Sequence, residues 1–196
     1  CSGLVKEDKA FNPSTPYAVS RAAADLSLLS FIKSYNFPVV FTRAANVYGE
    51  HQQLYRIIPR TLLFFLTGRK LELHGGGTSV RSFIHIDDVC RGTELAAEKG
   101  EIGEVFHFAT PENISIRALV EKIADRLEIC FDDNVKVTGE RLGKDEAYLL
   151  DCSLAKRRFS WEPVISLDEG LDRTTSWIQE NLNILLEQPQ DYIHKP

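Results

Sequence analysis

The pattern that most constrains the fold is a helical repeat of apolar residues that gives way at once to a short, continuous apolar run. From Tyr17 to Asn36, apolar residues recur at steps of three and four, which is typical of an amphipathic helix. The run 38–41 then has the composition of a strand buried on both faces. A helix followed directly by such a strand is typical of parallel α/β proteins, so we expect an α/β fold.

Further segments alternate in the same way along the chain. The run 57–66 is apolar, the runs 71–73 and 82–86 have the pattern of strands, and 105–108 predicts another strand. The tail 187–196 contains two prolines and is expected to be irregular.

Helix starts are marked by capping residues. Asp87 is predicted to cap one helix, and Ser115 is predicted to cap an amphipathic one. Ser166 and Glu169 have the spacing of a capping box before a last helix over 167–183.

A glycine-rich dinucleotide fingerprint is missing from the sequence. A complete doubly wound domain begins with a strand, a glycine-rich turn and a helix that holds the pyrophosphate. No G-x-G-x-x-G occurs, and the glycines 75–77 come before a strand instead of joining a strand to a helix. The sequence also has no methionine. We therefore interpret the chain as part of a longer protein, without the first βαβ units.

Composition excludes several classes of protein. The formal charge of −5 argues against a general nucleic-acid binder. The longest apolar run, 62–66, is far shorter than a membrane span. Four cysteines lie far apart with no C-x-x-C pair, which favours reduced thiols in a cytoplasmic protein over a disulfide framework or a zinc site.

Tyr17 and Arg21 are the strongest local signal of chemistry. Four residues apart on a helix, they lie on the same face, one turn from each other. A neighbouring cation favours the ionised phenol, and such a tyrosine can take a proton from a hydroxyl as a hydride leaves its carbon. Taken alone, the pair also fits an ordinary surface contact in the first turn of a helix.

The context of this pair resembles the Y-x-x-x-K segment of the extended short-chain dehydrogenases, the NAD-dependent epimerase/dehydratase family. The similarity starts at 14–25 and continues in order over nearly the whole chain, in the segments TRAANVYG (42–49), IPR (58–60), LHGGG (73–77), VRSFIHIDDV (80–89) and GERLGKD (139–145). The run 42–49 and the Gly-Lys-Asp loop are most similar to the NDP-glucose 4,6-dehydratases. The resemblance implies a Rossmann-like fold with a smaller α/β substrate-binding domain.

Several cofactor and catalytic roles are implied by the resemblance. Tyr17 would be the redox base. Arg21 would stand where the family has lysine, touching the nicotinamide ribose of NAD, and Ala44 would also border the cofactor. Arginine keeps the charge, but its fork is bulkier than the lysine ammonium, so the exchange is not conservative.

The resemblance also implies a nucleotide-sugar site. Asn46 would hydrogen-bond the diphosphate or the sugar. His74 and the glycines after it would border the base, where the lack of side chains permits close approach. Arg81 and Arg141 would clamp the phosphates, because a guanidinium pairs bidentately with phosphate oxygens, and Asp145 would contact the substrate. Solvated surface charges are the alternative interpretation of the two arginines. No metal is implied.

Other polar residues have structural interpretations. His85 is expected to be structural, and His51 and His107 to be packing or surface residues. The pair 87–88 fits a helix N-terminus better than acid/base work. Tyr48 is expected to pack beneath the loop that carries Asn46.

The implied reaction belongs to the whole protein. In such a dehydratase NAD oxidises C4 of the hexose, a carboxylate removes the C5 proton, water leaves C6 and the hydride returns to C6. The family's Asp-Glu pair and dinucleotide fingerprint lie upstream of the matched segments, so we expect this chain alone to be inactive. A 4-epimerase or decarboxylase of the same family, a redox-impaired nucleotide-sugar-binding paralogue and an unrelated α/β interaction domain remain as alternatives.

Domain and partner expectations follow from the same resemblance. Residues 1–55 would be the tail end of the dinucleotide-binding domain, 56–186 mainly the nucleotide-sugar-binding domain with short returns to the Rossmann sheet, and 187–196 an irregular tail. Small apolar residues at 22–24, with Leu28 and Leu29, exceed what one buried face needs. We therefore expect a homodimer through the Tyr17 helix, with a nucleotide-diphosphate sugar as the ligand.

Overall fold

The computed structural model describes residues 4–139 and 149–192. In chain order its elements are α1 (Pro16–Tyr35), β1 (Phe41–Ala44), β2 (Asn46–Tyr48), α2 (Ile57–Leu66), β3 (Leu71–His74), η1 (Gly75–Gly77), β4 (Val80–Arg81), β5 (Phe83–His85), α3 (Ile86–Lys99), β6 (Val105–Phe108), β7 (Ile114–Ser115), α4 (Ile116–Arg126), α5 (Phe131–Asn134), β8 (Val135–Thr138), α6 (Ser153–Phe159), α7 (Leu167–Glu180) and α8 (Leu182–Leu186).

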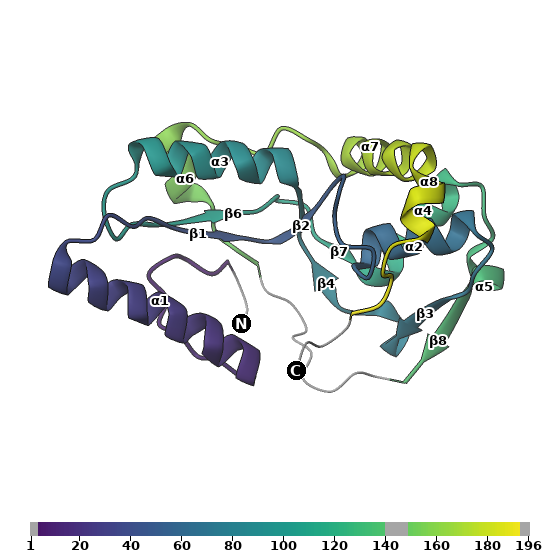
Figure 1. Cartoon of the computed structure of the whole chain (residues 1–196), viewed down its shortest axis with the longest axis horizontal. Coiled ribbons are helices and arrows are strands. Elements are labelled where there is room, and N and C mark those ends of the chain that lie inside the picture. Colours follow the sequence, from purple (N-terminus) through teal and green to yellow (C-terminus); the bar gives the residue numbers. More distant parts are fainter. Residues whose placement is uncertain (1–3, 140–148, 193–196) are drawn as a thin grey trace.

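The elements form two lobes that share one extended segment (Figure 1). In one lobe the pair β1–β6 lies between α1 on one side and α3 with α6 on the other. The other lobe holds α2, α4, α7 and α8 together with the pair β3–β8. Within the described residues the pairs β1–β6, β2–β5 and β3–β8 are parallel and β4–β7 is antiparallel, which confirms the predicted α/β fold.

The extended segment 41–48 changes its hydrogen-bonding partner at Ala45. Before that residue, β1 runs in register with β6, from Phe41 beside Val105 to Ala44 beside Phe108. After it, β2 pairs with β5. The chain therefore leaves one parallel pair and enters another at the carboxyl end of β1, the kind of position at which open α/β sheets bind ligands.

Each lobe has its own apolar core. The core beside β1–β6 contains aromatic residues that interlock, with Phe106 4.5 Å from Phe159 and Phe108 4.7 Å from Trp161 between ring centroids. The core of the other lobe is mainly aliphatic and includes buried Leu62, Leu63, Leu71, Leu119, Ile123, Leu171 and Ile178.

Tyr48 joins the extended segment to the second core. Its ring is buried, and its hydroxyl lies 3.4 Å from the Leu167 carbonyl at the start of α7. Gly170 makes this contact possible, because a Cβ at that position would lie 2.1 Å from the Tyr48 hydroxyl. The expectation that Tyr48 is a packing residue is confirmed.

Two predicted helix caps are confirmed and one is wrong. The hydroxyls of Ser115 and Ser166 accept hydrogen bonds from the third residue of their helices, at 3.0 and 3.2 Å. Asp87 does not cap α3. The N-cap is His85, whose Nδ1 accepts from the Asp87 backbone N–H at 3.3 Å. An imidazole nitrogen two residues earlier therefore takes the place that the sequence pattern assigned to the carboxylate.

Two predicted boundaries also shift. The first strand begins at Phe41 instead of Pro38. Proline has no N–H to donate, and before Phe41 the segment contributes, among the described residues, only the Val39 carbonyl, which accepts from Gly103 N. The last predicted helix ends at Glu180, not at residue 183. The Asn181 side chain donates to the Trp177 carbonyl at 2.8 Å and so competes with the helical hydrogen bonds there.

Helix α1 is attached to the first lobe by a polar contact. It ends as predicted, at Asn36 in the left-handed conformation. Arg43 on β1 donates to Asp25 at 2.8 Å and stacks on the Phe11 ring, 5.0 Å from its centroid. Within the described chain none of the α1 residues is fully buried. None of the described helices combines the length and hydropathy needed to cross a membrane.

The carboxylate of Asp88 connects α3 to the segment before α7. It is 1% exposed and accepts hydrogen bonds from the backbone N–H groups of Val164 and Ile165, both within 3.1 Å. Arg91 donates to the same carboxylate at 2.7 Å. Asp88 is therefore a structural anchor and not an acid/base group, as the sequence interpretation held for the pair 87–88.

We predict that Asp88→Ala lowers the free energy of unfolding by about 3 kcal/mol, because two buried backbone donors lose their acceptor and a charged partner remains. Urea denaturation followed by circular dichroism measures this. Asp87→Ala is the matched control, since the Asp87 side chain is 62% exposed and lies 3.3 Å from Arg173 and 3.6 Å from His85 Nδ1. Equal effects of the two substitutions would contradict the anchor role.

Candidate functional site

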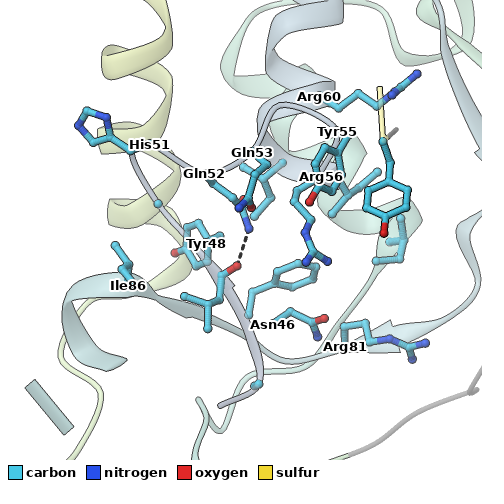
Figure 2. Close-up of a pocket in the computed structure, with 18 of the residues that line it drawn as sticks. Asn46, Tyr48, His51, Gln52, Gln53, Tyr55, Arg56, Arg60, Arg81 and Ile86 are labelled. Atoms are coloured by element: carbon cyan, nitrogen blue, oxygen red, sulfur yellow. Dashed lines mark hydrogen bonds between the residues drawn. The ribbon is translucent and has the colours of Figure 1, made fainter. Parts of the chain in front are cut away.

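A pocket of about 1380 Å³ opens where the extended segment changes partner. Its wall combines residues from the end of β2, the loop 49–56, the start of α2 and the strands β3 and β4 (Figure 2). The polar side chains that line it come from Tyr17, Asn46, Tyr48, Glu50, His51, Gln52, Gln53, Tyr55, Arg56, Arg60, Glu72, His74, Arg81 and Tyr192. Four residues predicted for the site, namely Tyr17, Asn46, His74 and Arg81, therefore share one pocket.

Tyr17 lies in the first turn of α1 with its side chain open to the pocket. Thr15 caps this turn by accepting from Ala18 N at 3.2 Å, and Pro16 occupies the first helical position. Tyr17 is 75% exposed and lines the pocket. Arg21 follows one turn later and is exposed, and Ala44 is half-buried at the end of β1. Neither of these two is among the residues that line the pocket.

Asn46 is held in one orientation at the carboxyl end of β1. Both its backbone N–H and its side-chain Nδ2 donate to the Ser82 carbonyl, at 3.1 and 3.0 Å. Ser82 is itself fixed, because its hydroxyl lies 3.1 Å from that of Thr110. Since Nδ2 is turned to Ser82, the amide oxygen Oδ1 faces the other way. The contacts with Ser82 thus fix the orientation of the Asn46 amide at the pocket wall.

Positive charge gathers on one side of the pocket. Figure 2 shows the Arg56 guanidinium extending toward Asn46, and Arg81 next to Asn46 with its guanidinium pointing away from that residue. Arg81 Nη1 donates to the Val80 carbonyl at 2.8 Å. Arg56 is the N-cap residue of α2, and the first turn of that helix contains no acidic side chain. The first N–H groups of a helix attract anions, and guanidinium groups bind phosphate oxygens strongly. This arrangement can bind an anion such as a diphosphate.

His74 lies at the end of β3, on the rim of the same pocket. Its Nδ1 is 2.8 Å from the Thr138 hydroxyl on the neighbouring strand β8. The glycines that follow adopt φ values of 56°, 63° and 70°, which side chains disfavour. These glycines are thus required by the backbone turn itself, in addition to any role in letting a ligand approach.

The loop after β2 lies directly on a buried histidine. His85 is fully buried, and its Nε2 is 3.2 Å from Glu50 Oε2. Nδ1 accepts from Asp87 N, so Nε2 is the ring nitrogen that faces Glu50. Gly49 permits this packing, since a Cβ there would lie 3.1 Å from Nε2 and 2.7 Å from the Ile86 side chain. His85 is structural, as expected.

Several other titratable residues have no proposed role in binding or catalysis. Burial raises the pKa of Tyr48, and burial lowers the pKa of His107. Burial also raises the pKa of Cys152 to about 11, so this thiol stays protonated. His51 lines the pocket while its ring packs on Trp177 at 4.8 Å. Among residues 4–139 and 149–192, no three His, Cys, Asp or Glu side chains are arranged to hold a metal ion.

Two predicted substrate residues, Arg141 and Asp145, lie outside the described residues. The proposed pairing of Arg141 with Arg81 therefore stays a prediction.

The sequence interpretation missed one residue of the site, because it gave no role to Arg56. Its position directly before the apolar run 57–66, at a helix start without an acidic residue, is a signal that points to an anion site.

The comparisons with known proteins agree with this geometry. The family described as GDP-mannose 4,6 dehydratase matches residues 2–174. A dTDP-glucose 4,6-dehydratase of Streptomyces antibioticus is 33% identical over 179 residues, which are 91% of this chain and 53% of that protein. An Arabidopsis thaliana trifunctional enzyme that includes UDP-glucose 4,6-dehydratase is 31% identical over 86% of this chain and 25% of its own length.

Solved structures show the same relationship. The crystal structure of dTDP-glucose 4,6-dehydratase from Streptomyces venezuelae with NAD bound superposes with a TM-score of 0.90 and 33% identity, covering 94% of this chain and 57% of that one. UDP-glucose 4-epimerase from Thermotoga maritima gives a TM-score of 0.84 at 29% identity, over 91% of this chain and 58% of the other.

This chain belongs to the GDP-mannose 4,6 dehydratase family, within the NAD-dependent epimerases and dehydratases of the extended short-chain dehydrogenase type. The Rossmann-like fold implied by the sequence resemblance is confirmed. The chain spans about half the length of the dTDP-glucose 4,6-dehydratases it matches.

We predict that Arg56→Ala and Arg81→Ala each weaken nucleoside diphosphate binding about tenfold, because each removes a charged hydrogen-bond donor from the anion side of the pocket. Isothermal titration calorimetry of the full-length protein measures the change. Arg157→Ala on α6 is the control, since that exposed arginine bonds to Ser153 away from the pocket. An unchanged affinity in both pocket variants would rule out this anion site.

Proposed function

We propose that the full-length protein is an NAD-dependent nucleotide-sugar 4,6-dehydratase, which converts an NDP-glucose to an NDP-4-keto-6-deoxyglucose. The observation that carries this proposal is that Tyr17, Asn46 and Arg81 line one pocket at the carboxyl end of β1. The similarity to dTDP-glucose 4,6-dehydratases over 91% of the chain supports the same reaction class. This chain supplies the tyrosine and much of the nucleotide-binding site.

The residues of this chain that would border NAD fit such a cofactor. Tyr17 is open to the pocket, and the small Ala44 lies at the end of β1, packed against the first core. When bound, NAD supplies the hydride acceptor and donor that this reaction needs. The chain itself contains no G-x-G-x-x-G, so the pyrophosphate of the cofactor would be held by other residues of the full-length protein.

The work of this chain in the reaction is proton transfer and positioning. Tyr17 takes the proton from the C4 hydroxyl, and the charge of Arg21 one turn away stabilises the negative charge that develops on the phenol oxygen. Asn46 presents Oδ1 as an acceptor for a sugar hydroxyl. Arg81 and Arg56 hold the diphosphate, which fixes the sugar relative to Tyr17.

A 4-epimerase is the second candidate. The structural similarity to UDP-glucose 4-epimerase, with a TM-score of 0.84, favours it specifically. An epimerase needs the same tyrosine and the same nucleotide-binding residues, so these residues alone do not distinguish the two reactions. The identity of the product distinguishes them.

We propose that residues 1–55 are the tail end of the dinucleotide-binding domain and that 56–186 mainly bind the nucleotide sugar, with returns to the Rossmann sheet. Ala96 of α3, Phe106 of β6 and Ala155 of α6 are such returns, since they belong to the first core. Tyr48 and Leu54 cross the other way, into the second core. The tail 187–196 remains a separate segment in this proposal. We propose a cytoplasmic location and no nucleic-acid partner for the full-length protein.

We also propose a homodimer through α1. Its exposed apolar side chains include Val19, Leu26, Phe31 and Tyr35, which are 48–75% exposed. Burying them against a second copy would remove this apolar surface from water. Analytical ultracentrifugation of the full-length protein is expected to show a dimer, and a monomer at micromolar concentration would contradict the proposal.

The reaction itself has a direct test. Full-length protein incubated with NAD and dTDP-, UDP- or CDP-glucose is expected to release a 4-keto-6-deoxy product from one of them, identified by NMR and mass spectrometry. A C4 epimer without keto product would replace the dehydratase by the epimerase.

Two variants control for the role of α1. Tyr17→Phe removes only the hydroxyl and is expected to lower kcat at least about 100-fold, since general acid–base catalysis contributes on that order. Arg21→Lys keeps the charge and is expected to retain activity. If the wild type were inactive and Arg21→Lys active, the natural protein would instead be a redox-impaired nucleotide-sugar binder.

A further inference from the structure

The segment after α8 folds back onto α2 and is fixed there by two arginines. Arg60 on α2 donates to the Gln190 carbonyl at 3.1 Å and pairs with Asp191 at 3.0 Å. Arg69 donates to the Gln190 side chain at 2.6 Å. Both guanidinium groups stack on the Phe64 ring, at 4.7 and 4.2 Å from its centroid.

The stacking gives this attachment a defined shape. A guanidinium held against an aromatic face is limited in its rotamers, so its remaining donors point in fixed directions. Gln190 also donates to the Leu186 carbonyl at the end of α8 at 3.3 Å. The backbone at residues 190–191 is thus tied both to α2 and to the helix that precedes it.

This attachment brings an aromatic ring to the pocket. Tyr192 follows directly and packs edge to face on Tyr55, with centroids 5.3 Å apart. Both tyrosines line the pocket, together with Arg56 and Arg81. Tyr192 is 65% exposed. The pocket therefore has an aromatic wall next to its cationic side.

We propose that the C-terminal segment 188–192 is part of the nucleotide-sugar site, and that Tyr192, supported by Tyr55, contacts the planar base of the nucleotide. This inference rests on the proposed function, because it takes the ligand to be a nucleoside diphosphate derivative. A planar base gains from stacking on or packing against a tyrosine, while its diphosphate needs the adjacent cations.

The same geometry assigns Arg60 a different task from Arg56. The Nη1 of Arg60 is engaged by the Gln190 carbonyl and Asp191, whereas the Arg56 guanidinium extends into the pocket toward Asn46 (Figure 2). Arg60 therefore acts on the ligand through the tail, as a positioning residue, and not as a phosphate ligand.

The experiment measures binding to the full-length protein by calorimetry, with UDP, dTDP, CDP and GDP as probes and inorganic pyrophosphate as a probe without a base. Tyr192→Ala is expected to weaken binding of the preferred nucleotide about tenfold and to leave pyrophosphate binding unchanged. Tyr192→Phe keeps the ring and is expected to bind like the wild type.

Arg60→Met tests the positioning role. It is expected to weaken nucleotide binding and spare pyrophosphate, and the double variant with Tyr192→Ala is expected to bind like Tyr192→Ala alone, because both changes remove the same contact. Additive losses, with weaker pyrophosphate binding, would show that Arg60 contacts the phosphates and would overturn its assignment.

The outcomes separate this inference from the proposed function. If the wild type binds a nucleoside diphosphate and Tyr192→Ala binds it equally well, the base contact is refuted while the proposed function stands. If the wild type binds none of the four nucleotides, the proposed function fails and the inference fails with it.

Discussion

The change of hydrogen-bonding partner at Ala45 is the constraint on which the rest of the structure depends. It ends the pair β1–β6, starts the pair β2–β5 and leaves Asn46 at the point of divergence. Where neighbouring parallel strands diverge, a crevice forms beyond their carboxyl ends. The backbone groups there are not hydrogen-bonded within the sheet. The pocket, the orientation of Asn46 by Ser82 and the approach of the α2 N-terminus all follow from this one event.

The pocket shows how an acidic chain can bind an anion. The formal charge is −5, yet Arg56 and Arg81 both line the cleft, and α2 adds the positive end of its dipole. Local placement of charge, not the overall balance, decides which ligand this surface attracts.

The sequence predicted the helices and strands better than their ends and the contacts between them. Helix α1, the strand at 105–108 and the serine caps were predictable because each depends on neighbouring residues. The cap of α3 was not, because it uses an imidazole nitrogen where the pattern offers a better-known carboxylate. In the site, Tyr17, Asn46, His74 and Arg81 came from a family resemblance, and the pocket brings them together. Arg56 and Tyr192 were missed, since their value comes from contacts between segments far apart in the chain.

Hydrogen bonds of Asp88 and Tyr48 connect the two lobes. Asp88, on the helix beside the first core, holds the backbone of Val164 and Ile165, and this backbone leads into α7. The first carbonyl groups of α7 in turn receive the Tyr48 hydroxyl, two residues from Asn46. If the 160–167 connection loosened, Tyr48, which lines the pocket, would lose its hydrogen-bond acceptors. No residue of that connection lines the pocket itself. We therefore expect the two lobes to unfold together, because separating them would expose apolar residues of both cores.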